Sequence, residues 1–375
     1  MGVSAPLDIG IVAPPWVPVP PPVYGGTEMV VDTLARGLVR AGHRVELFAT
    51  GDSTCPVPTR WLHATALGTG APPGAEAAHV QAAYARLAEA GVDVVHDHTV
   101  AGPLWAATRH PDLPVVTTNH GPFSADLLAG FEWVARRMPL VAISEAHRRS
   151  APSVAVAEVI HHGIDLDAFP LGAGDGGYLL FLGRMSATKG AHRAIAVARA
   201  AGRPLVIAAK MREPDEHRYF HDEVEPHLGD DVRYLGEVGG ARKLELLGGA
   251  EALVNPIRWS EPFGLAMIEA LACGTPVLVF PEGAAPEIVE HGRNGFLCRD
   301  EADMAARVGD VAGLDRATCR ASAAERFSLG RFVDRHVSLY RRAIEALAAR
   351  SAPPSAPPGP GAGTVLLPGV LGTPS

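Results

Sequence analysis

The sequence has few cysteines and no long apolar segment. Its four cysteines are scattered without CxxC spacing. No uninterrupted apolar run reaches the roughly 18 residues that a membrane-spanning helix requires, and the apolar start of the chain is broken by Asp8 and then by prolines. We therefore expect reduced thiols and a cytoplasmic protein, with membrane contact at most peripheral, at the inner face of the membrane.

An excess of positive charge is also missing. The 375 residues carry a formal net charge of −8, which argues against a nucleic-acid partner bound mainly through its phosphates. Apolar residues make up 47% and charged residues 20% of the chain, as in ordinary globular proteins. Because the chain is too long for one typical core, we expect two domains of roughly 150 to 200 residues each.

Strand-like runs alternate with segments of helical periodicity along the chain. The first strand is expected at 7–14, a helix at 27–42 and a second strand at 43–50. The alternation predicts an α/β fold of two Rossmann-like, doubly wound domains. Further buried strands are expected at 92–98, 114–121, 139–145 and 158–165, and then at 178–183, 204–209, 232–238, 251–257 and 276–280.

Glycine and proline mark the expected domain boundaries. Residues 1–170 form the predicted N-terminal domain, 171–177 a hinge and 178–328 the C-terminal domain. A helix is expected at 329–350. Residues 351–375, rich in proline and glycine, are predicted to be a disordered tail.

Two glutamates, Glu261 and Glu269, flank a predicted helix start. Pro262 suits the first helical position, and the helix is expected from Gly264 onward. On a continuous helix eight residues rise about 12 Å, more than the roughly 5 to 9.5 Å between paired glycosidase carboxylates. We therefore expect the two carboxylates to bind opposite ends of one ligand, whose phosphate lies at the free amides of Gly264 and Leu265.

Cations and glycines follow other predicted strands. Arg184 and Lys189 bracket a turn before a helix, which suits a diphosphate, and Lys210 is a third candidate cation. Gly25 and Gly26 allow a ligand to approach the backbone closely. They are not part of a GxGxxG sequence, so the dinucleotide fingerprint is absent.

Histidines follow two strands of the predicted N-terminal sheet. His120 comes directly after one strand, facing the expected cleft, and His96, Asp97 and His98 end another. The HxH pair supplies two metal ligands, but no third ligand with recognisable spacing follows, so no metal site is expected. Asp97 and His98 are then either part of a substrate-contacting loop or buried polar groups at a strand end.

Several motifs together resemble family 4 of the retaining nucleotide-sugar glycosyltransferases. They are "GRMSATKG", "EPFGLAMIEALACGTPV" and "GAAPEIVEHGRNGFL", preceded by "YGGTE", "NHG", "VAISEAHR" and "HHGIDLDAF". The resemblance covers about residues 7–345. It implies the GT-B architecture, in which two Rossmann-like domains face each other across a cleft, the second holds most of the donor, and the helix at 329–350 crosses back to the first.

The residues and the resemblance together define a candidate site. The diphosphate is expected at Arg184 and Lys189, the ribose at Glu269, the base at Val238 and the transferred sugar at Glu261 and His120. No cofactor and no metal are expected, because the nucleotide sugar is a co-substrate. The candidate residues are His120, Arg184, Lys189 and Glu261 for catalysis; Gly25, Gly26, Lys210, Val238, Gly264, Leu265 and Glu269 for donor binding; and Asp97 and His98 on the acceptor side.

The reaction implied by the resemblance is hexosyl transfer with retention of configuration. No carboxylate nucleophile is identifiable, so we expect a front-face mechanism, with a UDP-hexose favoured as donor and GDP and dTDP sugars left open. The acceptor, whether a small molecule, an oligosaccharide or a lipid-linked sugar, stays open. Competing hypotheses are a nucleotide-sugar epimerase or sugar phosphorylase, a non-catalytic sugar-nucleotide-binding protein, and an NAD oxidoreductase, for which the fingerprint is missing.

Overall fold

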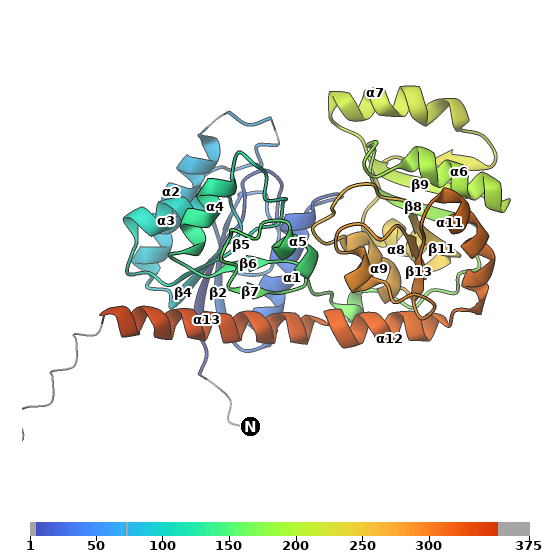
Figure 1. Cartoon of the computed structure of the whole chain (residues 1–375). Helices are drawn as coiled ribbons and strands as arrows, with labels where there is room; N and C mark the ends of the chain where they lie inside the picture. Colours follow the sequence, from blue (N-terminus) through green and yellow to red (C-terminus); the bar gives the residue numbers. More distant parts are fainter. Residues whose placement is uncertain (1–4, 69, 73, 352–375) are drawn as a thin grey trace, which may run out of the picture.

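Two parallel β-sheets, each covered by helices, make up the computed structural model, which describes residues 5–68, 70–72 and 74–351 (Figure 1). The first sheet has seven strands in the order β3-β2-β1-β4-β5-β6-β7. All its strand pairs are parallel. Its strands are β1 (Asp8–Val12), β2 (Arg44–Ala49), β3 (Thr59–Trp61), β4 (Val94–Asp97), β5 (Val115–Thr118), β6 (Leu140–Ala142) and β7 (Glu158–Val159).

The second sheet has six strands in the order β10-β9-β8-β11-β12-β13. Both sheets reverse their strand order next to the first strand of the domain, as doubly wound folds do. The predicted fold class is therefore confirmed. The strands are β8 (Leu179–Arg184), β9 (Leu205–Lys210), β10 (Val232–Tyr234), β11 (Ala252–Asn255), β12 (Val277–Val279) and β13 (Gly295–Leu297).

Helices connect the strands and cover both faces of each sheet. In the first half of the chain they are α1 (Gly26–Arg40), α2 (Ala75–Ala90), α3 (Gly102–Arg109), α4 (Leu128–Ala135), α5 (Glu145–Arg149) and the 3₁₀ turn η1 (Leu166–Ala168). In the second half they are α6 (Ala191–Ala201), α7 (Pro214–Glu223), η2 (Glu225–His227), α8 (Gly240–Gly249), α9 (Leu265–Ala272), α10 (Ala285–Ile288), α11 (Glu301–Val308), η3 (Gly309–Gly313), α12 (Arg316–Phe327) and α13 (Leu329–Ser351).

The last helix returns to the N-terminal domain. Figure 1 shows α12 and α13 end to end along one side of the molecule, beneath both domains. Helix α13 packs on α1 at Gly37, where a Cβ atom would lie 2.6 Å from Val333 and 2.7 Å from Leu329. Because glycine has no side chain, the two helices approach closely there. Tyr340 of α13 is fully buried in the same interface.

The segment predicted as a hinge, 171–177, is fastened to the C-terminal domain. The amides of Gly172, Gly174 and Gly176 donate to the carbonyls of Cys273, Gly248 and Gly249. The Arg316 side chain also donates to the Gly172 carbonyl. The glycines of segment 171–177 therefore allow close packing against α8 and the end of α9. The glycine-rich composition had instead suggested a flexible segment.

Other expectations differ from the structure in detail. Strands β3 and β13, of three residues each, were not predicted. The strand expected at 158–165 is reduced to Glu158–Val159. The predicted tail, 351–375, lies outside the described residues except for Ser351, the last residue of α13.

Candidate active site

The described residues of both domains enclose a cavity of about 610 Å³. Its walls come from the loops after β1, β5, β8, β10 and β11, where the carboxyl ends of parallel strands gather. The predicted residues that line the cavity are Gly25, Gly26, His120, Arg184, Lys189, Val238, Glu261, Gly264, Leu265 and Glu269.

A lysine and a glutamate form the first ion pair of the cavity. The Lys189 ammonium lies 2.5 Å from Oε2 of Glu261, and both side chains are largely buried. The backbone of Glu261 is also held, since its amide donates to the Trp259 carbonyl and its carbonyl accepts from the Ala284 amide. The pair leaves Oε1 of Glu261 for a ligand.

A second ion pair lies deeper in the same wall. The Lys243 ammonium is 2.7 Å from Oε1 of Glu269, and their side chains are 17% and 12% exposed. Lys243 lines the cavity but was missed by sequence reasoning, which searched the loops and not the first turn of α8. One signal was available: the chain has only three lysines, and the other two, Lys189 and Lys210, were already candidates.

Arg184 lines the cavity, whereas Lys210 does not. Lys210 ends β9 and is only 6% exposed, and its ammonium lies 3.1 Å from Glu216 and 3.5 Å from Glu213. The predicted donor-binding residue Lys210 therefore lies outside the cavity lining, and the start of α7 supplies the carboxylate partners that a buried ammonium needs. Glu216 also lies 3.4 Å from Arg184. Lys210 is therefore connected to the cavity indirectly, because it shares the Glu216 carboxylate with Arg184.

Along the chain, the start of α9 lies between the two ion-paired glutamates, Glu261 and Glu269. Gly264 adopts φ +102°, a conformation that other residues rarely adopt, and the helix begins at Leu265. Among the described residues no acceptor is recorded for the amides of Gly264, Leu265 and Ala266, as expected for a helix start. Pro262 was predicted at the first helical position. It lies instead in the preceding loop, where its carbonyl accepts from Ser144.

The N-terminal wall of the cavity carries glycines and neutral histidines. Gly25 and Gly26 form the start of α1, and a Cβ atom on Gly26 would lie 3.6 Å from Leu265 across the domain boundary. His120 lines the cavity together with His162, which sequence reasoning did not select as a candidate. The two rings stack with centroids 5.2 Å apart.

Behind this wall the histidines continue to the crossing helix. His98 Nδ1 lies 2.8 Å from His120 Nε2, the ring of His98 packs on His96, and that of His96 on His336 of α13. Burial lowers the pKa of His120 to about 3 and that of His336 to about 4. The pKa values of His96, His98 and His162 are also well below the ordinary value, for the same reason.

Asp97 and His98, the residues predicted on the acceptor side, lie outside the cavity lining. The Asp97 carboxylate accepts from the Tyr84 hydroxyl at 2.7 Å and from both the amide and the hydroxyl of Thr99. Its burial raises its pKa to about 6. Asp97 is therefore a buried polar group at a strand end, and His98 contacts the cavity only through His120.

Residues 5–68, 70–72 and 74–351 contain neither a metal-binding cluster nor a helix that could span a membrane. No three or more His, Cys, Asp or Glu side chains are arranged there to hold a metal ion. In the same ranges no helix combines the length and the apolar character needed to cross a bilayer. The four cysteines are all described, and each is a buried free thiol.

Comparison with known proteins identifies the family. A sequence model described as Glycosyltransferase Family 4 matches residues 24–168, and one described as Glycosyl transferases group 1 matches residues 165–314. The solved structure of AviGT4, a glycosyltransferase involved in avilamycin A biosynthesis, is similar with a TM-score of 0.69 and 28% identity, covering 91% of this chain and 98% of that one. The chain therefore belongs to glycosyltransferase family 4 and has the GT-B fold.

Curated relatives match over part of their length. The glycogen synthase of Mycobacterium tuberculosis is 32% identical over 251 residues, which are 58% of this chain and 60% of that protein. The D-inositol 3-phosphate glycosyltransferase of Mycolicibacterium smegmatis is 29% identical over 310 residues, 70% of each chain. The two relatives are named for different activities.

Proposed function

We propose that the protein transfers a hexosyl group from a nucleoside-diphosphate sugar to an acceptor hydroxyl, with retention of configuration. The observation that carries this proposal is the pair of lysine–glutamate contacts on either side of the free amides at the start of α9. A ligand with hydroxyls at both ends and phosphates between them matches that order. A nucleotide sugar has this chemistry.

The charges at the cavity suit a diphosphate. Its wall carries three cations, Arg184, Lys189 and Lys243, and two carboxylates, Glu261 and Glu269. The cations therefore outnumber the carboxylates by one. When the sugar–phosphate bond breaks, the leaving diphosphate gains negative charge, and fixed cations and helix-start amides stabilise that charge without reorganisation.

Each end of the donor has its own carboxylate. Oε2 of Glu269 is left to accept from the ribose hydroxyls, since Lys243 contacts Oε1. Oε1 of Glu261 is left for hydroxyls of the transferred sugar, since Lys189 contacts Oε2. Val238 also lines the cavity, and we propose that the base lies against it. We favour a UDP-hexose as the first donor to test.

A front-face, metal-independent reaction accounts for the groups present. Among the described residues that line the cavity, Glu261 and Glu269 are the carboxylates, and each is ion-paired, so neither is an unpaired nucleophile for a covalent intermediate. The departing phosphate oxygen would then take the proton of the acceptor hydroxyl. If EDTA abolished turnover and added Mg²⁺ restored it, the metal-independent mechanism would be wrong.

Nucleotide binding is the first test. In a thermal-shift panel of UDP, GDP, ADP, dTDP and NAD, a nucleoside diphosphate should raise the melting temperature, because a ligand at 100 times its Kd stabilises the native state by about 2.7 kcal/mol. Glu269→Gln and Arg184→Ala should lose most of that shift. Arg218→Ala, at an exposed ion pair with Asp215 outside the cavity lining, is the control and should keep it. A shift with NAD alone would overturn the proposal.

Turnover separates the two glutamates and the competing activities. Loss of the Glu269 carboxylate in Glu269→Gln should weaken nucleotide binding by roughly 10- to 100-fold, because a hydrogen bond to a charged group contributes about 1.5 to 3 kcal/mol. Glu261→Gln should retain nucleotide binding and slow transfer. An altered donor formed without acceptor would indicate an epimerase, a requirement for inorganic phosphate would indicate a phosphorylase, and binding without turnover would indicate a non-catalytic protein.

A further inference from the structure

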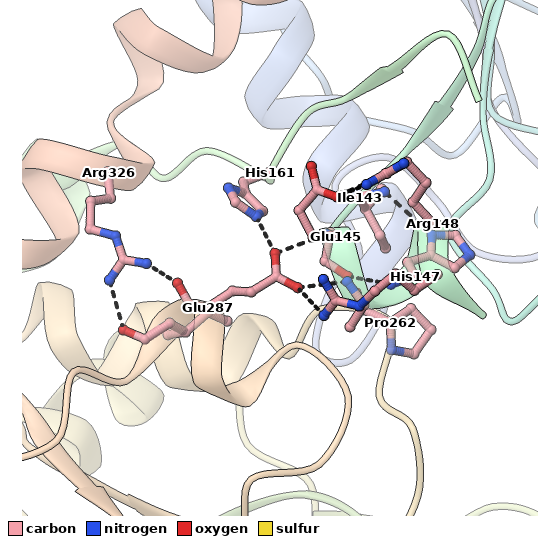
Figure 2. Close-up of polar contacts among 12 residues, drawn as sticks. Ile143, Glu145, His147, Arg148, His161, Pro262, Glu287 and Arg326 are labelled. Atoms are coloured by element: carbon pink, nitrogen blue, oxygen red, sulfur yellow. Dashed lines mark hydrogen bonds and ion pairs between the residues drawn. The ribbon is translucent and has the colours of Figure 1, made fainter. Parts of the chain in front are cut away.

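A carboxylate of the C-terminal domain contacts the backbone of the N-terminal domain outside the cavity. Oε1 of Glu287, on α10, accepts from the Ala146 amide at 2.6 Å, and Oε2 accepts from the Glu145 amide at 2.9 Å. His161 Nε2 lies 2.8 Å from the same carboxylate. Figure 2 shows the Glu287 carboxylate between His161 and Glu145. This one side chain therefore links α10 with the first turn of α5.

The same turn of α5 also holds the loop that carries Glu261. The Ser144 hydroxyl, at the start of α5, donates to the Pro262 carbonyl at 2.6 Å. Its oxygen accepts from the His147 amide, which fixes the hydroxyl in place. The residue next to Glu261 is thus bound to the N-terminal domain through one buried hydrogen bond.

A third contact connects the Glu261 loop with α10. The amide of Ala284, just before α10, donates to the Glu261 carbonyl at 3.0 Å. Gly283 packs against the backbone of Glu261 so closely that there is no room for a Cβ atom. The start of α10, the Glu261 loop and the first turn of α5 therefore form one polar unit across the domain boundary.

The Glu287 contact is charge-assisted. Burial of this carboxylate favours its neutral form, but hydrogen bonds from His161, Glu145 and Ala146 outweigh burial and lower the pKa of Glu287 below its ordinary value. Arg149 lies 3.9 Å from the carboxylate, and Arg326 donates to the Glu287 carbonyl. The groups that hold the ionised carboxylate thus belong to the N-terminal domain, while Arg326 of the C-terminal domain holds the backbone of Glu287.

We propose that Glu287 is a positioning residue, which holds the two domains in the arrangement where the N-terminal wall faces Glu261. This inference rests on the proposed function, because it concerns the reaction at that site. The charged residues that would contact the nucleotide sugar all belong to the C-terminal domain. They are Arg184, Lys189, Lys243, Glu261 and Glu269. Loss of the Glu287 contact should therefore spare nucleotide binding and slow the chemical step.

A matched carboxylate elsewhere provides the control. Glu158 of β7 is 17% exposed, against 16% for Glu287, and it also joins separate segments through its ion pair with Arg335 of α13. It does not line the cavity. Glu158→Gln removes a comparable ion pair without touching the contact between α10 and α5. A general loss of stability would appear in both variants.

The test compares Glu287→Gln, Glu287→Ala and Glu158→Gln with the wild type. For each we would measure the Kd of UDP by calorimetry, the hydrolysis of UDP-glucose with water as acceptor, and the radius of gyration by small-angle scattering with and without UDP. Both Glu287 variants should keep the Kd within threefold, lose at least tenfold in hydrolysis and show a larger radius of gyration. Glu158→Gln should match the wild type in all three measurements.

Two results would overturn the inference. One is a Glu287→Ala protein with wild-type hydrolysis and wild-type radius of gyration. The other is a parallel loss of melting temperature, affinity and hydrolysis in the Glu287 and Glu158 variants, which would mean a purely structural role. A wild type that neither binds UDP nor hydrolyses UDP-glucose would contradict the proposed donor, while the scattering comparison of the ligand-free proteins would still test the Glu287 contact.

Discussion

The two walls of the cavity differ in the kind of side chain they present. The C-terminal wall carries five charged side chains, four of them joined in lysine–glutamate pairs. The N-terminal wall carries glycines and the histidines His120 and His162, which burial keeps neutral. Charge recognition is thus confined to one domain, and the other contributes shape and neutral polar groups.

This difference divides the work of the proposed reaction. Fixed charges suit a nucleotide, whose phosphates keep their position throughout the reaction. Neutral rings and bare backbone suit an acceptor hydroxyl, which must form its new bond without being held by a strong charge. A change confined to one wall should therefore leave the role of the other wall intact.

The largest effect is expected from Lys189→Ala. This change removes a cation that stabilises the leaving diphosphate, so kcat should fall by about 10²- to 10³-fold, as when one fixed donor to developing charge is lost from other active sites. The measurement is steady-state transfer or hydrolysis of the best donor, with Arg218→Ala as the exposed control. A Lys189→Ala enzyme with wild-type kcat and only a raised KM would show that the C-terminal wall binds the donor without assisting bond cleavage.

The sequence predicted the parts of this wall that depend on local spacing. Arg184 and Lys189 bracket one turn after a strand, and Glu261 lies beside a helix start, so neighbouring residues were enough. Lys243 was missed because its partner Glu269 lies on another helix, and only the packing of α8 beside α9 brings them together. Partner choice between helices is a tertiary property that no local pattern contains.

Residues at strand ends differ in the direction of their side chains. Asp97 and Lys210 each end a parallel strand at the expected edge of a sheet, yet neither side chain lines the cavity. Asp97 binds Tyr84, and Lys210 binds Glu216, only six residues further along the chain. The position of a residue at a strand end predicts that it lies at the edge of the sheet. The direction of its side chain depends on which buried group forms a hydrogen bond or ion pair with it.

Acid should lower the free energy of unfolding through the buried histidines in and behind the N-terminal wall. His96, His98, His120, His162 and His336 have lowered pKa values in the folded state, against about 6.5 when unfolded. As the pH falls below about 6.5, the unfolded chain takes up protons first, so stability present at higher pH is lost. For each histidine that stays neutral when folded, the loss at pH 5 is about 2 kcal/mol. Urea unfolding at pH 7.5, 6 and 5 measures this loss.

A pair of histidine variants isolates that effect. His336→Phe should reduce the slope of stability against pH by about one proton, whatever its effect on stability at pH 7.5. The control is His221→Gln, at an exposed side chain paired with Glu225. If both variants kept the wild-type slope, His336 would not be part of the acid response.

The smallest effect is expected from two neighbouring glycines of the N-terminal wall. A Cβ atom on Gly25 would lie 2.7 Å from Pro21 and 2.9 Å from the Glu28 carboxylate, whereas one on Gly26 meets only Leu265, at 3.6 Å. Gly25 is extended, with φ 173°, so its restriction is one of space. Gly25→Ala should lower the free energy of unfolding by about 1 to 3 kcal/mol, as overpacking does.

Gly26→Ala tests the shape of the wall by itself. Its methyl group fits the folded protein, so stability should stay within about 0.5 kcal/mol of the wild type, in the range of unstrained substitutions. Nucleotide affinity should also be unchanged, because the charged contacts lie on the opposite wall. Turnover should fall by about 10-fold, or about 1.4 kcal/mol, if the donor passes close to this backbone. A Gly26→Ala protein that loses nucleotide affinity would place the phosphates against α1 and end the division of labour between the two walls.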